Sequence, residues 1–221
     1  MYEYSRQYNK HFHFPLSALT MNHDGRHFSL AWLVVFLLLT FVSPMSIQIG
    51  TLDAVDAVTT IMNDAYRIGE TGILVQPFYR ATRDEVVQMM EKNQILTLSI
   101  DQDVVGCIKV HVVQDGVAEW GCLAVAQQDL RKGYGKLLVQ AAEGHIKTIL
   151  KCDVAQLELL APSSWKHAHK ERLRDWYQRM GYSLANENYD ASTMRLPQGS
   201  LLGDRFELAT DGDFTCYQRK L

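Results

Sequence analysis

Residues 121–139 read GCLAVAQQDLRKGYGKLLV, and this stretch decides the fold. An apolar, strand-like segment runs into a turn that contains Gly133 and Gly135, and an apolar helix follows at once. Glycine lets the backbone approach a ligand closely, and the free amides and positive dipole end of a helix start attract anions. The turn also carries three basic side chains: Arg131, Lys132 and Lys136. We therefore predict that the backbone of residues 131–136 binds a pyrophosphate.

Two other glycine-loop motifs do not fit this turn. The nucleoside-triphosphate loop requires glycine five positions before Gly135 and Ser or Thr after Lys136, but Leu130 and Leu137 occupy these positions. The dinucleotide-binding fingerprint requires a small residue at the position of Leu138. Both motifs are therefore excluded.

Composition limits the remaining classes. With 221 residues, 47% of them hydrophobic, the chain can bury one sizeable core. The formal net charge of −3 gives no overall affinity for polyanions, so we expect no nucleic-acid partner. The four cysteines, at 107, 122, 152 and 216, show no Cys-x-x-Cys pair and no metal-ligand spacing with histidine. We expect buried thiols, no metal and a reducing, cytoplasmic compartment.

The first 44 residues form an appendage to the domain predicted over residues 45–221. Its apolar run, residues 30–42, is shorter than the roughly 20 residues that cross a bilayer. Three interpretations stay open: a mis-assigned start upstream of Met45, a membrane or sorting segment, or a packed helix. Any membrane association is expected to depend on this run.

Hydrophobic periodicity predicts an α/β domain with an antiparallel meander in its middle. A Thr82-Arg-Asp-Glu capping box opens one helix, and Asp53 is the predicted cap of an earlier one. The predicted strands are 46–52, 95–101, 104–113, 117–126, 155–160, 183–188 and 214–220, and the predicted helices are 53–67, 82–90, 136–150 and 169–180. The long loop 197–213 is expected to frame a substrate.

From Ser46 to Leu221 the chain resembles the GNAT superfamily of acyl-CoA-dependent N-acetyltransferases. The turn RKGYG at 131–135 is similar to the family's pyrophosphate loop, and LRDWYQRMGY at 173–182 is similar to its later helix motif. The resemblance implies a GNAT-like fold, with a mixed and mostly antiparallel sheet flanked by helices, and acetyl-CoA as co-substrate. Leu130 departs from the Gln or Arg usual there; either Arg131 replaces that contact or the affinity is lower.

The resemblance also implies roles for individual residues. The amides of Arg131, Lys132, Gly133, Tyr134, Gly135 and Lys136 are expected to hold the CoA pyrophosphate, and the strand end Leu123, Ala124 and Val125 to bind the pantetheine arm. The Val125 amide would stabilise the charge on the thioester oxygen. Tyr177 is the expected acid for the departing thiolate, and Glu119 the expected base for the amine. The alternatives are helix packing for Tyr177 and an ordinary strand position for Glu119.

The acceptor is the least determined part of the prediction. We expect the primary amine of a small molecule, which requires loops 68–82 and 197–213 to close over a pocket. A protein or peptide acceptor would need an open groove between these loops, and a non-catalytic acyl-CoA-binding module is a further alternative. His167, His169, Tyr79, Arg80 and Arg83 are lesser candidates for lining the acceptor site. The sequence does not determine the oligomeric state.

Overall fold

The computed structural model describes residues 45–186, 188–203 and 205–221. The N-terminal appendage, including its apolar run at 30–42, lies outside the described residues. Within the described part, no helix combines the length and the apolar character that a membrane crossing needs.

One mixed sheet forms the centre of the domain, in the order β1-β2-β3-β4-β5-β10-β6, and β7 also pairs with β10. Its strands are β1 (Met45–Ile49), β2 (Ile95–Ile100), β3 (Asp103–Gln114), β4 (Val117–Val125), β5 (Val154–Pro162), β6 (Ser183–Leu184), β7 (Thr193–Leu196) and β10 (Gly212–Lys220). Every pairing is antiparallel except that of β4 with β5. The predicted sheet type, mixed and mostly antiparallel, is confirmed.

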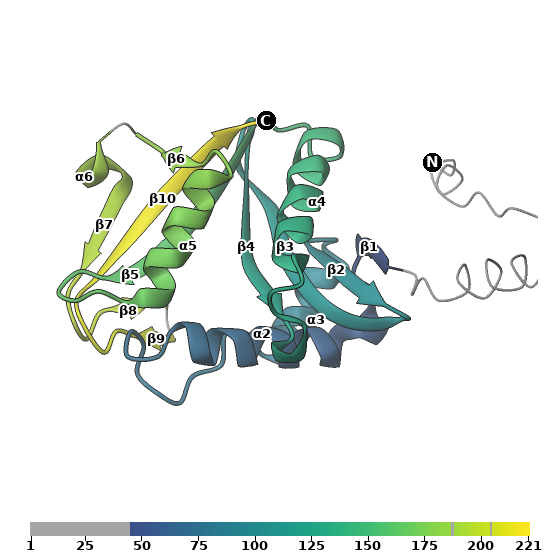
Figure 1. The fold of residues 1–221 in the computed structure, drawn as a ribbon, viewed down its shortest axis with the longest axis horizontal. Helices are drawn as coiled ribbons and strands as arrows, with labels where there is room; N and C mark the ends of the chain where they lie inside the picture. Colours follow the sequence, from purple (N-terminus) through teal and green to yellow (C-terminus); the bar gives the residue numbers. More distant parts are fainter. Residues whose placement is uncertain (1–44, 187, 204) are drawn as a thin grey trace, which may run out of the picture. The chain divides into compact units, whose positions relative to one another are not determined.

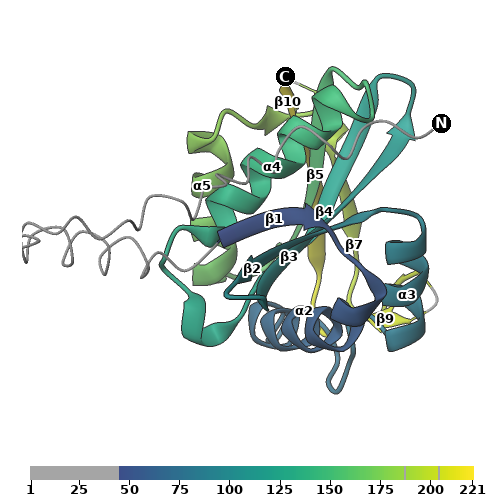
Figure 2. The same cartoon turned by 90° about the vertical axis from the view of Figure 1, so that its right-hand side faces the viewer.

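Helices cover both faces of this sheet (Figures 1 and 2). Helices α2 (Val55–Gly69) and α3 (Arg83–Glu91) pack on one face, and α4 (Tyr134–Thr148) and α5 (Ala168–Arg179) pack on the other. The alternation of strand side chains explains the two layers, because successive residues point to opposite faces. Leu96 and Leu98 of β2 join the core under α4, whereas Ile95 joins the core under α2 and α3.

Strands β4 and β5 pair over only three residue pairs. The parallel register runs from Val117–Val154 to Glu119–Gln156 and then stops, although both strands continue. The strands separate below this point in Figure 1. In the same stretch, the register between β3 and β4 shifts, so that Cys122 and Leu123 face the single residue Ile108, and Cys122 has a φ of 49°. Such a bulge bends a strand, and here it accompanies the opening of a slot inside the sheet.

Several local predictions differ from the structure. A 3-10 helix, η2 (Leu52–Ala54), contains Asp53, and the N-cap of α2 is Ala54, so the predicted Asp53 cap is wrong. The capping box at Thr82 is confirmed, with both of its reciprocal hydrogen bonds. The predicted strand 183–188 is only the two-residue β6, because the following chain turns through Asn186 and α6 (Tyr189–Ser192) into β7.

The predicted loop 197–213 holds a small hairpin of its own. Its strands β8 (Leu201–Leu202) and β9 (Phe206–Glu207) pair with each other. Elsewhere in the chain, a short 3-10 helix, η3 (Gln127–Asp129), follows β4. The hairpin lies against the link between α2 and α3, where Leu74 forms an isolated bridge with Leu208.

A buried polar network ties α4 to the sheet. The Trp120 indole donates a hydrogen bond to the Tyr182 hydroxyl (2.7 Å), which donates to the Glu143 carboxylate (2.9 Å). Arg219 of β10 donates to both oxygens of the same carboxylate, at 2.9 and 3.1 Å. The Trp120 ring also packs edge-on against Tyr177 and Tyr182. This network fixes Trp120, and with it the position of α5 over β4.

We predict that Tyr182→Phe lowers the free energy of unfolding by about 1–3 kcal/mol, because it leaves the buried Trp120 N–H without its acceptor and removes one of the donors to Glu143. Tyr189→Phe is the matched control, since it removes a hydroxyl that bonds to Asp213 at an exposed position. Urea denaturation should show a loss below about 0.5 kcal/mol for the control. Equal losses in the two variants would contradict the structural role of the network.

Candidate active site

The turn before α4 has the geometry of an anion-binding helix start. Gly133 is the N-cap of α4 with φ 85°, a left-handed conformation that favours glycine, and it has no side chain with which to cap the helix. The first hydrogen bonds into the helix start at Lys136 and Leu137, which both donate to the Gly133 carbonyl. The amides that precede them are the orphan donors of a helix start, and residues 130–133 are exposed. An anion can therefore reach these amides.

The charges around this turn are positive on balance. The first turn of α4 contains no acidic residue. Lys132 is ion-paired with Asp129 at 2.7 Å, which leaves Arg131 and Lys136 as basic side chains beside the helix start. Leu130, the departure from the family pattern, is 48% exposed and so adds apolar surface here rather than a polar contact.

The end of β4 presents its backbone to the slot between β4 and β5. Ala126 donates its amide to Val105 of the β3 side at 2.8 Å, and Val125 is paired in register with Gly106. Antiparallel ladders alternate, so the residue next to Ala126 directs its N–H away from β3. The Val125 amide therefore points toward the slot, where β5 no longer pairs with β4.

Tyr177 of α5 is buried against Trp120 of β4. Its ring packs edge-on against Trp120 at 5.5 Å and lies 5.3 Å from the ring of Trp176. Burial raises the pKa of the Tyr177 hydroxyl, and the Glu70 carboxylate raises it further. The phenol therefore stays protonated at neutral pH, as a proton donor must. The packing alternative and the acid role are compatible, because the ring packs while the hydroxyl carries the proton.

Glu119 lies where β4 and β5 part. It faces Gln156, whose amide donates to the Glu119 carboxylate at 3.1 Å, and Gln156 in turn accepts from Gln218 at 2.8 Å. Glu158, two residues further along β5, is a neighbour that the sequence did not single out. Burial against the sheet and the charge of Glu119 raise the pKa of the Glu158 carboxyl to about 7. Two carboxylates thus share the entrance of the slot.

A second group of side chains, which sequence analysis mostly missed, surrounds Tyr177 from the α2 side. Glu70 and Lys170 form a buried ion pair at 2.6 Å, and the second carboxylate oxygen of Glu70 is buried without a partner in the described residues. Burial raises the pKa of Tyr66, whose hydroxyl also interacts with Cys122, Arg80 and Tyr177. Glu70 and Lys170 are 100 positions apart, and no local motif marks either of them.

The five lesser candidates for the acceptor site lie in different environments. His167 is the N-cap of α5 and accepts a hydrogen bond from the Lys170 amide. His169 lies beside Gly69 of α2, where a Cβ on that glycine would meet its ring, and burial lowers the pKa of His169. Tyr79 is 67% exposed, and Arg83 bonds to Asp56 at 2.8 Å on the surface. Arg80 lines one of the two cavities described below, and the other four residues line neither of them.

Loops 68–82 and 197–213 are joined along their backbones. Val75 donates to the Glu207 carbonyl at 2.9 Å, and Ala209 donates to the Ile73 carbonyl at 2.8 Å. Arg205 adds a 2.9 Å bond to the Arg80 carbonyl. No open groove therefore separates these two segments where they pair.

Two cavities are candidates for an acceptor. One of about 490 Å³ lies between the ends of β7, β10 and β5, lined by residues 163, 195–197 and 211–213, and it contains none of the candidate catalytic residues. The other, of about 290 Å³, lies between α3 and the sheet and reaches Arg80 and the bulge residue Cys122. The second cavity is the one next to the slot.

Comparison with known proteins identifies the family. The acetyltransferase (GNAT) domain model matches residues 91–184, from the end of α3 to β6, which includes the slot, the glycine turn and Tyr177. The chain carries a GNAT domain. The search of curated proteins gave no match.

Solved structures share the fold of this GNAT domain at low identity. An N-acetyltransferase from Staphylococcus aureus Mu50 is 16% identical with a TM-score of 0.57, over 80% of this chain and 99% of that one. A ribosomal-protein-alanine N-acetyltransferase from Brucella melitensis gives the same four values. The protein yncA of Salmonella typhimurium, solved with its cofactor acetyl-CoA, is 15% identical with a TM-score of 0.56, over 81% and 95% of the two chains.

Metal ligands are not grouped in the described part of the GNAT domain, where no three His, Cys, Asp or Glu side chains lie close enough to hold an ion. All four cysteines are free, and Cys107, Cys122 and Cys152 are buried, as predicted.

We predict that Glu158→Gln stabilises the protein at pH 8 but not at pH 4. A carboxyl whose pKa is raised to about 7 by folding binds its proton more tightly in the folded state. The free energy of unfolding therefore falls as the pH rises from about 4.5 to 7, and the amide substitution removes this loss. Because Glu158 is partly exposed, we expect a gain of only about 1 kcal/mol, or about 3 °C in Tm.

Differential scanning calorimetry at the two pH values measures this effect. Glu91→Gln, at an exposed position of α3 away from Glu119 and Glu158, is the control. Its Tm relative to the wild type should be the same at both pH values. A Glu158→Gln variant with the same relative Tm at pH 4 and pH 8 would contradict the raised pKa.

Proposed function

We propose that the protein transfers an acetyl group from acetyl-CoA to the primary amine of a small molecule, by direct attack and without a covalent enzyme intermediate. The observation that carries this proposal is the slot between β4 and β5. Its edge holds the outward-pointing Val125 amide, and the orphan amides of residues 131–135 follow at the end of the same chain segment. A thioester arm in the slot and its diphosphate at the helix start fit this arrangement.

The residues present suit the donor in charge as well as in shape. The helix start offers backbone N–H groups, Arg131 and Lys136 supply mobile positive charge, and no acid in the first turn of α4 opposes a diphosphate. Leu123 and Ala124 precede Val125 on β4 and would line the pantetheine arm together with it. Tyr134 packs into the core under α4 and so anchors the turn.

Each chemical step then has a group to serve it. Glu119, directly or through a water molecule, accepts the proton that the ammonium form of the acceptor must lose. The Val125 amide stabilises the negative charge that develops on the carbonyl oxygen when the amine attacks. Tyr177 donates its proton to the thiolate as the carbon–sulfur bond breaks, and its raised pKa means that the phenol carries this proton at neutral pH.

The closure of the acceptor side favours a small amine over a peptide. Loops 68–82 and 197–213, between which a peptide groove was considered, are held together by backbone hydrogen bonds. The neighbouring cavity of about 290 Å³ suits a small molecule rather than an extended chain.

We predict that Tyr177→Phe lowers kcat by about 100-fold or more, because the thiolate then leaves without its proton. Its acetyl-CoA Kd should stay within about twofold of the wild-type value, since the diphosphate contacts lie in residues 131–136. Release of free CoA with a panel of primary amines measures turnover, and calorimetry measures the Kd.

Three other outcomes would each change the interpretation. If the protein binds acetyl-CoA but releases no CoA with any amine, it is a non-catalytic acyl-CoA-binding module and not an enzyme. If peptides are added to the panel and only they are acetylated, the acceptor is a polypeptide and not a small molecule. Unchanged kcat in Tyr177→Phe would remove the acid role and leave Tyr177 a packing residue.

A further inference from the structure

The cavity between α3 and the sheet is lined mainly by cations. Four basic side chains contribute to its wall: Arg80, Lys92, Lys109 and Arg205. Glu85 is the one carboxylate among the residues that line it. An uneven set of fixed charges of this kind, in a concave site with low-dielectric walls, attracts anions.

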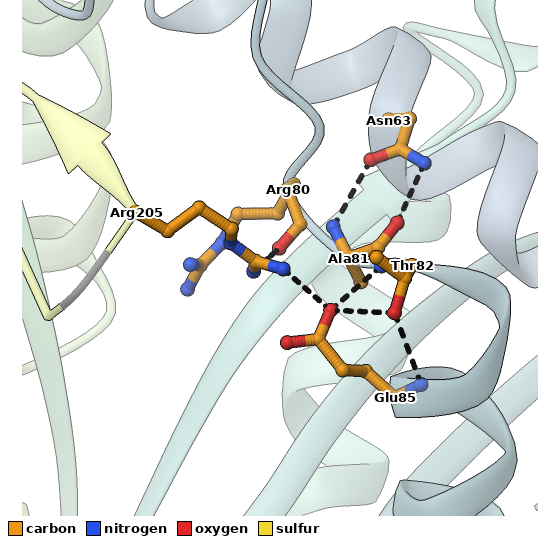
Figure 3. A network of polar contacts seen from close by, with 6 residues as sticks. All are labelled: Asn63, Arg80, Ala81, Thr82, Glu85 and Arg205. Carbon is orange, nitrogen blue, oxygen red and sulfur yellow. Dashed lines mark hydrogen bonds and ion pairs between the residues drawn. The ribbon is translucent and has the colours of Figure 1, made fainter.

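The single carboxylate that lines the cavity, Glu85, already has partners within the protein. Glu85 accepts from Arg205 at 2.6 Å and from the Thr82 amide at 2.7 Å, as part of the capping box of α3 (Figure 3). Glu85 therefore neutralises Arg205 only. None of the ion pairs found between described side chains includes Arg80, Lys92 or Lys109.

Arg80 is held in place before any ligand arrives. Asn63 of α2 clamps the next residue, Ala81, by accepting from its amide (3.1 Å) and donating to its carbonyl (2.9 Å), while Arg205 donates to the Arg80 carbonyl (Figure 3). The Arg80 guanidinium lies 5.0 Å from the Tyr66 ring centre, and its Nε is buried without a hydrogen-bond partner in the described residues.

Two guanidinium groups also share one aromatic ring. Arg80 lies 5.5 Å and Arg205 4.5 Å from the ring centre of Phe206, so two like charges are brought together on the same side chain. Cation–π contact offsets part of their repulsion. A bound anion would offset more of it, because Glu85 pairs with Arg205 and no described carboxylate forms an ion pair with Arg80.

The cavity lies next to the reaction slot. Cys122, the bulge residue of β4, lines it, and Val125 is only three residues further along the strand. The Arg80 guanidinium lies 5.0 Å from the Tyr66 ring centre, and Arg80 and Tyr177 both influence the pKa of the Tyr66 hydroxyl. Lys109 stands opposite Gly121 in the sheet, and no described atom lies within 4 Å of the position that a Cβ on Gly121 would take.

We propose that the acceptor amine also carries an anionic group, a carboxylate or a phosphate ester, and that Arg80 and Lys109 bind this group in the cavity. The inference rests on the proposed acetyl transfer and names the class of its acceptor. Arginine suits this task because its planar fork pairs with either oxyanion through two hydrogen bonds. Lys109 adds a point charge from the opposite wall.

Matched acceptors test the proposal on the full chain. The carboxylate pair is 4-aminobutyrate and 4-aminobutanamide, the phosphate pair is 3-aminopropyl phosphate and 3-aminopropanol, and putrescine is the cationic member. CoA release gives kcat/KM for each. We expect at least one anionic member to exceed its neutral partner about tenfold or more, and the arm in which this occurs identifies the anion.

The variants separate charge recognition from loss of the fold. Arg80→Gln and Lys109→Gln should each lower kcat/KM for the preferred anionic acceptor about tenfold, mainly through KM, and leave the neutral partner within about twofold. Arg80→Lys should restore part of the loss. Arg83→Gln is the matched control, an arginine three positions away that pairs with Asp56 outside the cavity.

Failure of the inference and failure of the proposed function give different results. Turnover of the neutral amines or putrescine at least as fast as their anionic partners would overturn the anionic acceptor and leave acetyl transfer standing. If the protein binds acetyl-CoA but turns over none of these acceptors, both the anionic acceptor and the proposed acetyl transfer are contradicted. Equal losses for charged and neutral acceptors in Arg80→Gln would show that Arg80 supports the fold and does not select the acceptor.

Discussion

The early end of the pairing between β4 and β5 is the constraint on which the structure depends. Three residue pairs hold the two strands together up to Glu119 and Gln156, and the bulge at Cys122 then bends β4. Backbone groups in the interior of a sheet are normally paired, and unpaired ones are costly unless a ligand or solvent satisfies them. The slot leaves the Val125 amide free, and the proposed reaction uses it to bind the thioester.

The two faces of the sheet then have separate tasks. On one face, α4 begins at the end of the slot, and the network of Trp120, Tyr182 and Glu143 fixes the helix and the ring on which Tyr177 packs. On the other face, α3, the chain on either side of it, strands β3 and β4, and Arg205 between β8 and β9 line the cavity that contains Arg80 and Lys109. In the proposed reaction, donor chemistry depends mainly on backbone groups and acceptor selection on side chains, so one fold can keep the first and vary the second.

The sequence predicted the features that depend on local patterns. The glycine turn, the capping box at Thr82, the meander and the sheet type all follow from periodicity and turn chemistry over short windows. The Glu70–Lys170 pair, the Glu158 neighbour of Glu119 and the clamp of Asn63 on Ala81 were missed, because each joins segments that only the tertiary fold brings together. Arg80 was named among several candidates, and its cavity separated it from Tyr79 and Arg83.

Amide hydrogen exchange at single-residue resolution tests the central claim most directly, because it reports on the backbone groups themselves. With saturating acetyl-CoA, the account predicts slower exchange at Val125 and at residues 131–135, and little change at Ala126, whose amide already donates to Val105. Binding detected by calorimetry without protection at Val125 and the helix start would contradict the account, as would the absence of any binding.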